Sequence, residues 1–254
     1  MAKFFRRIRQ QLLSESKLTK YLLYAAGEII LVVIGILIAL GINNKNQRSV
    51  TRAKEQTYLI GLHEEFSISK NKLEQLIKVN QDNYNGAKAL LNFMSTSDSV
   101  PSERLFSSLL FDTFSSDVAF NPNNSLLQEM INSGSLKDIS NTVLRIQLTN
   151  WISTIDDVSK QEQELGIQRE KVLDMFRTEH TSLRTIYDET GITNHLGIHP
   201  NQKSYSNLHL LTSRVFENNV LMFILTARSM KEAHYKPLFR DLEEILQLIE
   251  GEIE

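Results

Sequence analysis

The amino-acid sequence predicts an all-α protein in which one N-terminal transmembrane helix is followed by an elongated helical bundle. An apolar run of 22 residues near the N-terminus carries a single charge. Most of the remaining chain repeats its apolar residues at spacings of three and four, and no strand-length alternation stands out. We therefore expect a basic amphipathic cytoplasmic segment, a transmembrane helix, a stalk and a soluble helical bundle over residues 1–20, 21–42, 43–58 and 59–254, respectively.

Charge is divided unevenly along the chain. The protein has 28 Lys and Arg residues and 30 Asp and Glu residues. Ten of the basic residues lie within the first 54 residues, against the acids Glu15 and Glu28, which leaves 18 basic and 28 acidic residues for the remainder. A basic end attached to an acidic domain is typical of a membrane-facing protein and argues against nucleic-acid binding. The absence of Cys excludes zinc–thiolate sites, iron–sulfur sites and thiol nucleophiles.

The apolar run at 21–42 has the length of a membrane span. At ~1.5 Å per residue such a helix reaches ~33 Å, which matches the ~30 Å hydrocarbon core of a bilayer. Lys20 precedes the run and Lys45 follows it, as expected at the two ends of a spanning helix. A secretory signal peptide cleaved near Gly41 is the alternative, but its charged region would be unusually long. We expect a retained single-pass anchor.

Basic residues near the two ends of the run favour one orientation. Six lie within residues 1–20 and four within 43–54, which favours a cytoplasmic N-terminus with residues 43–254 outside the cytoplasm. The bias is modest, so the opposite topology stays open. We expect four basic residues to face anionic lipid of the bilayer, with a disordered basic tail as the alternative: Lys3, Arg6, Arg7 and Arg9.

Two residue pairs in the run are candidate contacts with another membrane helix. Glu28 lies near the middle of the span, where an ionised carboxylate costs up to ~2.5–3.5 kcal/mol. Tyr24, one turn earlier, can donate a hydrogen bond to it, or a polar group on a second helix can pair with it; a neutral or snorkelling carboxyl is equally open. Gly35 and Ala39 form a small-xxx-small pair that permits close helix approach. Both a homo-oligomer and a membrane protein partner fit this pattern.

The first seam of apolar residues in the soluble part runs from Leu59 to Met94 and predicts one long helix. Its start near residue 50 leaves little room for a linker, so we expect it to continue the membrane helix. Three polar residues interrupt the seam, and we expect them to form interhelix hydrogen bonds or to be exposed rather than to bind a ligand: Ser69, Asn80 and Asn83.

A second seam, from Leu144 to Phe176, predicts another long helix with Trp151 in the core. We expect a break near Gly166 and an end at Gly191.

Shorter helices are predicted at 102–116 and 125–133. For the second of these we expect a capping box from Ser125 to Gln128 and a C-cap at Gly134.

The C-terminal part begins with a predicted loop at 192–204. Two helices follow at about 204–230 and 237–253, the latter opened by Pro237.

The motifs of familiar catalytic and nucleotide-binding sites, including GxGxxG, HExxH and GxSxG, do not occur. His195 and His199 have a ligand-like spacing, but they lie in a Gly/Pro loop without a third ligand, so we expect solvated side chains. The acidic stretches at 161–164 and 241–244 are typical of solvated helix faces. We expect no metal and no cofactor.

These observations favour a non-enzymatic, membrane-anchored domain that acts as a binding, sensory or scaffolding module. One alternative is an accessory subunit of a membrane complex, which contacts its partner through the transmembrane helix. A second is an enzyme with an unrecognised site, for which a pocket containing residues of perturbed pKa would be the discriminating observation.

The segment FFRRIRQQLLSESKLTKYLLYAAGEIILVVIGILIALGINN at 4–44, above all GEIILVVIGILIAL at 27–40, resembles the N-terminal signature of a family of uncharacterised single-pass membrane proteins of Gram-negative bacteria, domain of unknown function 6090. NSLLQEMINSGSLKDISN at 124–141 is similar to a second block of that family. Members usually carry Gln and Trp near the positions of Gly41 and Lys45, so an interfacial tryptophan is missing here. The resemblance implies an inner-membrane anchor and a helical soluble domain, and it implies no activity.

Overall fold

The computed structural model describes residues 18–95, 100–201 and 205–254, and over these residues the chain is helical and contains no β-strand. The predicted all-α class is confirmed. The structure divides into two units, Met1–Glu55 and Gln56–Glu254. The predicted lipid-facing residues Lys3, Arg6, Arg7 and Arg9 lie outside the described part of the chain.

Helix α2, Leu18–Ser95, is one continuous helix of 78 residues that contains the whole predicted span. It is the one helix of the described chain that is long and apolar enough to cross a bilayer, with a mean hydropathy of 2.6 in its most apolar window. Large apolar side chains between Leu22 and Ile42 are exposed, as a segment in contact with lipid acyl chains requires. The expected continuation of this helix into the first bundle helix is confirmed.

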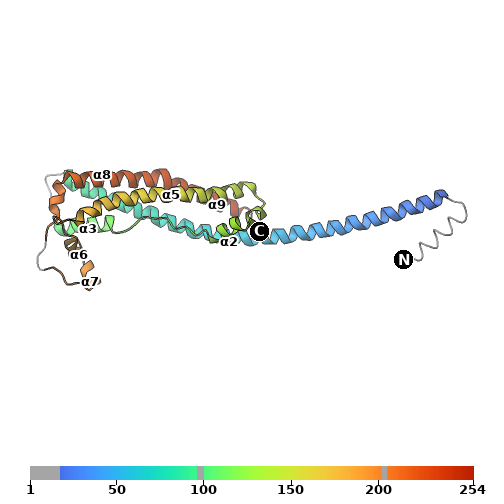
Figure 1. The fold of residues 1–254 in the computed structure, drawn as a ribbon, viewed down its shortest axis with the longest axis horizontal. Helices are drawn as coiled ribbons and strands as arrows, with labels where there is room; N and C mark the ends of the chain where they lie inside the picture. Colours follow the sequence, from blue (N-terminus) through green and yellow to red (C-terminus); the bar gives the residue numbers. More distant parts are fainter. Residues whose placement is uncertain (1–17, 96–99, 202–204) are drawn as a thin grey trace. The chain divides into compact units, whose positions relative to one another are not determined.

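The Gln56–Glu254 unit is a bundle of four helical segments, here called legs, which run alternately up and down (Figure 1). The first leg is the part of α2 from Gln56 to Ser95, and the third is α5, Thr142–Asp174. The second leg consists of α3 (Glu103–Phe114), a connection at 117–124 and α4 (Ser125–Asn132), which the short helix η1 (Ser135–Asp138) joins to α5. The fourth leg consists of α8 (Arg214–Ser229), the π-helix η4 (Met230–Tyr235) and α9 (Lys236–Glu250).

Hydrogen bonds between side chains and the facing leg establish these directions. Successive residues of α2 bond residues progressively earlier in the C-terminal part of the chain: Gln56 bonds Glu252, just after the fourth leg, and Lys70 and Asn80 bond Glu243 and Ala227 within it. Successive residues of α5 do the same: Gln147 with Glu244, Glu162 with Tyr235, and Lys171 with Asn219. The first and third legs are therefore parallel to each other and antiparallel to the fourth.

The second leg is held in place by residues of α2. The carboxylate of Glu65 accepts hydrogen bonds from Leu126 N at 2.6 Å and Leu127 N at 3.3 Å, at the start of α4. The predicted capping box is wrong, because Asn124 is the N-cap, its side chain makes no capping bond, and the free N–H groups point at α2 instead. Gly134 lies just beyond the helix with φ of 70°, which matches its predicted role at the C-terminal end.

Helix α5 does not break at Gly166 and does not extend to Gly191. A helix-interior glycine costs only about 1 kcal/mol, and the buried residues around Gly166 hold the helix straight through it. The helix ends at Asp174 and is followed by η2, Met175–Arg177. Ser182 then caps a separate helix α6, Leu183–Thr190, and Gly191 ends that one with φ of 77°.

The C-terminal helices also differ from the prediction. The short helices α7 (Ile192–His195) and η3 (Leu208–Thr212) precede α8. Pro237 lies in the first turn of α9, as predicted, but the π-helical segment immediately before it joins α9 to α8 without a break.

The core is continuous along the four legs and contains most of the predicted seam residues. Trp151 is 1% exposed, and its ring lies 5.2 Å from that of Phe66 and 6.3 Å from that of Phe120. The predicted core position of Trp151 is confirmed. It joins the first, second and third legs at one level of the bundle.

Candidate functional site

A pocket of about 330 Å³ lies between α3, the end of α5 with η2, and α6. Its walls are mainly apolar and aromatic, as is usual for sites that bind small molecules. The ring of Phe111 meets that of Tyr187 edge-on, with 6.3 Å between their centroids. Eight apolar or aromatic residues line this apolar pocket: Leu110, Phe111, Phe114, Leu173, Phe176, Leu183, Ile186 and Tyr187.

Helix α6, one wall of the apolar pocket, is fixed to α3 through a chain of hydrogen bonds. Glu103, in the first turn of α3, accepts hydrogen bonds from Asn207 N at 3.0 Å and from the Ser206 hydroxyl at 2.6 Å. The buried side chain of Asn207 in turn accepts a bond from Ser182 N and donates one to Ser182 O, at the N-cap of α6. The wall is thereby positioned by polar contacts outside the apolar surface.

The polar edge of the pocket begins with Arg169 of α5, whose side chain is 15% exposed. Its guanidinium donates to Phe114 O at 2.8 Å and to Ser115 O at 3.3 Å, the carbonyl groups at the C-terminal end of α3. A positive charge at this end of a helix also interacts favourably with the helix dipole. Arg169 therefore fixes where α3 ends and so defines one side of the pocket.

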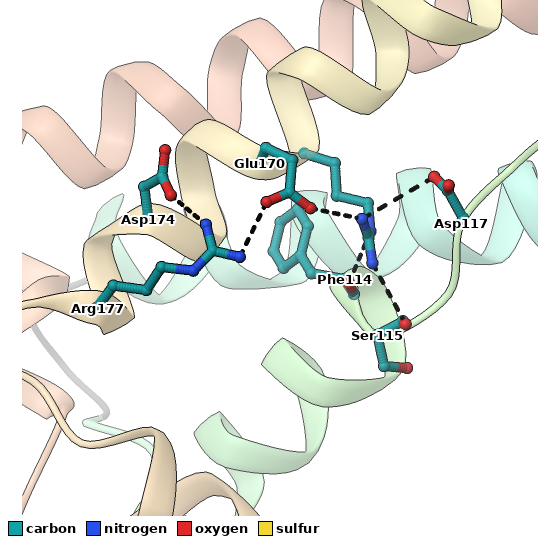
Figure 2. A network of polar contacts seen from close by, with 7 residues as sticks. Phe114, Ser115, Asp117, Glu170, Asp174 and Arg177 are labelled. Atoms are coloured by element: carbon teal, nitrogen blue, oxygen red, sulfur yellow. Dashed lines mark hydrogen bonds and ion pairs between the residues drawn. The ribbon is translucent and has the colours of Figure 1, made fainter.

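Carboxylates neutralise both arginines at this edge (Figure 2). Glu170 lies between them and accepts hydrogen bonds at 3.0 Å from Arg169 and from Arg177. Arg177 also pairs with Asp174, and Arg169 lies 3.9 Å from Asp117. The two cations thus face three anions, and the edge has no excess of positive charge with which to attract an anionic ligand.

The predicted membrane-contact residues all lie on the N-terminal part of α2. Glu28 is partly exposed, and Tyr24, Gly35 and Ala39 are exposed. A Cβ added at Gly35 would meet no atom within 4 Å. Their predicted contacts with another helix stay a prediction.

The three polar residues of the first seam are buried, and two of them form the expected contacts between elements. The hydroxyl of Ser69 accepts a hydrogen bond from Asn123 N at 2.8 Å, and Nδ2 of Asn80 donates to Ala227 O at 3.0 Å. Asn83 is 3% exposed, and its Nδ2 has no partner among the described residues.

His195 and His199 are exposed. In the part of the chain that the structure describes, no three His, Asp or Glu side chains are grouped so that they could hold a metal ion.

Sequence reasoning did not single out the apolar pocket, because its walls come from three segments whose apolar residues look like ordinary core. A signal was nevertheless present for Arg169 at its edge, and also for Glu162, which lies in the core outside the pocket lining. Glu162 and Arg169 are charged residues at positions where the second seam should be apolar. In the structure both turn inward and bond other legs: Glu162 bonds Phe120 and Tyr235, and Arg169 bonds the end of α3.

No curated protein and no solved structure matches this chain. A family model does match, over residues 28–186, which include the second half of the apolar run, α3, α4, α5 and the first residues of α6. The match covers more than half of the chain, and it agrees with the resemblance seen in the apolar run. The protein therefore belongs to the family of unknown function DUF6090.

Proposed function

We propose that this protein is a non-enzymatic binding module, anchored in a bacterial inner membrane by residues 21–42, whose helical bundle holds an uncharged apolar ligand in the apolar pocket. The observation that carries the proposal is the pocket itself: about 330 Å³, with eight apolar or aromatic lining residues. The paired charges at its edge favour a neutral ligand, because an anion would have to displace a carboxylate from Arg169 or Arg177.

The titration behaviour of the pocket edge supports a binding role over a catalytic one. Hydrogen bonds that Arg177 donates to Asp174 and to Glu170 raise the pKa of its guanidinium, so this group is not suited to exchanging protons with a substrate. Glu162, whose pKa burial raises, is 7% exposed and is bonded within the core to Tyr235. Glu162 is not part of the lining of the apolar pocket, so its carboxyl group does not meet a ligand bound there.

Ligand binding is tested with 1-aminoanthracene, an uncharged fluorescent probe, on the full chain in lipid nanodiscs. We expect saturable fluorescence enhancement with the wild type and at least ~10-fold weaker binding with Leu183→Trp, which fills the pocket mouth. The matched control is Leu196→Trp, at an exposed leucine outside the pocket, which should bind as the wild type does. Equal binding by all three proteins would refute the assignment to this pocket.

The proposed orientation is testable because the chain has no cysteine of its own. A membrane-impermeant maleimide should label Ser159→Cys, an exposed position on α5, in cells whose outer membrane alone is permeabilised. Ala2→Cys should be labelled only after the inner membrane is opened. The reverse pattern would establish the opposite topology.

A further inference from the structure

A second cavity, of about 380 Å³, lies between α2, α8 and the π-helix η4. Its walls are polar, unlike those of the apolar pocket: α2 supplies Asn80, Gln81 and Tyr84, and the fourth leg supplies Arg228, Lys231 and Glu232. At ~30 Å³ for each water molecule, this polar cavity has room for a solute of about a dozen heavy atoms.

Asn80 is the buried acceptor of the polar cavity. The residue is 1% exposed, and its Nδ2 donates to Ala227 O at 3.0 Å, which identifies the other terminal atom as the oxygen. This Oδ1 is buried and has no hydrogen-bond partner among the described residues. An unsatisfied buried acceptor is destabilising, so the position favours a ligand that brings an O–H or N–H donor.

The charges around the polar cavity favour an anion. Lys231 donates to the neutral amide oxygen of Gln81 at 2.6 Å, so its ammonium charge has no carboxylate in that bond. Arg228 adds a second positive charge. The one acid of the cavity wall, Glu232, is already bonded to Lys236, and this bond, more than the nearby Lys231 and Arg228, lowers its pKa.

The backbone at the polar cavity is unusual in a way that supports a site. The π-helix begins at Met230, three residues after the carbonyl that Asn80 binds, and it carries Lys231 and Glu232. Single π-helical turns inside α-helices occur frequently at functional sites, because the extra residue displaces side chains from the regular helical face.

We propose that the polar cavity binds a small phosphate-type oxyanion, whose O–H group donates to Oδ1 of Asn80 and whose charged oxygens contact Lys231 and Arg228. Inorganic phosphate carries such an O–H group at neutral pH, whereas a phosphate monoester carries one only as its monoanion, below its second pKa of about 6. The assignment does not depend on the apolar pocket, which lies between different helices.

The test compares phosphate with sulfate on the full chain in uncharged detergent micelles at constant ionic strength and neutral pH, by isothermal titration calorimetry. The two anions have the same shape, but only hydrogenphosphate carries an O–H donor, so phosphate should bind at least ~10-fold more tightly than sulfate. Glycerol phosphate, which at neutral pH is mainly a dianion without an O–H group on phosphorus, is titrated in parallel and should bind more weakly than inorganic phosphate.

Three variants assign the binding to this cavity. Lys231→Gln should weaken phosphate binding at least ~10-fold, and Asn80→Ala should bring the phosphate and sulfate affinities together. Lys160→Gln, on another face of the bundle, is the matched control and should bind as the wild type does. Lys231→Gln removes only a partly exposed side chain and keeps the test valid if Asn80→Ala fails to fold. Equal affinity for the two anions, wild-type binding by Lys231→Gln, or no saturable binding would each overturn the proposal.

Discussion

The hydroxyl of Tyr235 donates a hydrogen bond to Oε1 of Glu162, with 2.7 Å between the two oxygens, in the core between the third and fourth legs. The same carboxylate oxygen accepts a bond of 2.8 Å from Phe120 N in the second leg. Buried residues of the fourth leg are spaced by three or four from Phe216 to Met230 and again from Tyr235 to Ile245, but the step between Met230 and Tyr235 is five. In a regular α-helix that step would turn Tyr235 about 140° away from the seam. The π-helix absorbs the extra residue and keeps the hydroxyl on Glu162.

Glu162 should make the stability of the bundle depend on pH. Burial raises the pKa of Glu162 above its ordinary value of 4.5, although the bonds from Tyr235 and Phe120 lower it. The folded state therefore binds this proton more tightly than the unfolded state, so the contribution of Glu162 is most favourable below about pH 4.5 and declines as the pH rises through the raised pKa. We therefore expect the Tm of Glu162→Gln minus the Tm of the wild type, measured by thermal unfolding, to increase from pH 4 to pH 7.5. The exposed neighbour Glu164→Gln is the control, and a Tm difference independent of pH would contradict the assignment.

Glu65→Ala should destabilise the second leg by about 1–2 kcal/mol, because it removes the carboxylate that caps α4 from outside. Glu64→Ala, at an exposed position of the same helix turn, should change stability by no more than a few tenths of a kcal/mol. Urea unfolding of the full chain in micelles measures both. Equal effects would show that the bonds to Leu126 and Leu127 contribute nothing specific.

Gly86 and Gly166 should respond in opposite ways to alanine. A Cβ at Gly86 would overlap Oγ1 of Thr113, where α2 and α3 approach closely, so Gly86→Ala should cost about 1–3 kcal/mol. The double variant Gly86→Ala, Thr113→Ala should recover most of that loss. Gly166→Ala meets no atom within 4 Å and should stabilise α5 by up to about 1 kcal/mol. If Gly166→Ala lost as much stability as Gly86→Ala, the loss at Gly86 could not be attributed to the contact with Thr113.

Arg169→Met should lower stability by about 1–3 kcal/mol, since it leaves the carbonyl oxygens of Phe114 and Ser115 without their donor. The exposed Arg177→Met should leave the Tm unchanged, because its ion pairs lie in solvent. Hydrogen exchange gives a local measurement: the amides of the last turn of α3 should lose protection in Arg169→Met alone. Unchanged protection of these amides in Arg169→Met would show that Arg169 does not stabilise the end of α3.

Crosslinking in intact cells, followed by mass spectrometry of the purified membrane fraction, tests the predicted helix contacts of the anchor. If Glu28 pairs with a polar group of another membrane protein, a defined partner should crosslink to the wild type and be lost in Glu28→Gln, with normal folding in both. A conservative change on the same segment, Ile36→Leu, is the control. Crosslinks to copies of this chain alone would instead support a homo-oligomer.

The parts of the fold that could be predicted are those in which apolar residues repeat regularly along one helix. The apolar run, the two long seams and the core position of Trp151 follow from residue spacing, because burial of an apolar stripe is a property of a helix taken by itself. The ends of helices were less predictable. Ser125 and Gln128 have the types and spacing of a capping box, yet Glu65 caps α4, because a carboxylate 61 residues away in sequence lies nearer to its N–H groups.

The sequence by itself determined the helical class, the candidate membrane anchor and the membership of this family, since each depends on a local pattern of residue types. Only the tertiary structure decided the direction of the four legs, the π-helix before Pro237, and the two cavities. Both cavities are formed by side chains from segments far apart in the chain. A charged or polar residue on an apolar seam can be recognised in the sequence as a residue with an unusual role. Its bonding partner, however, is decided only when the legs pack together.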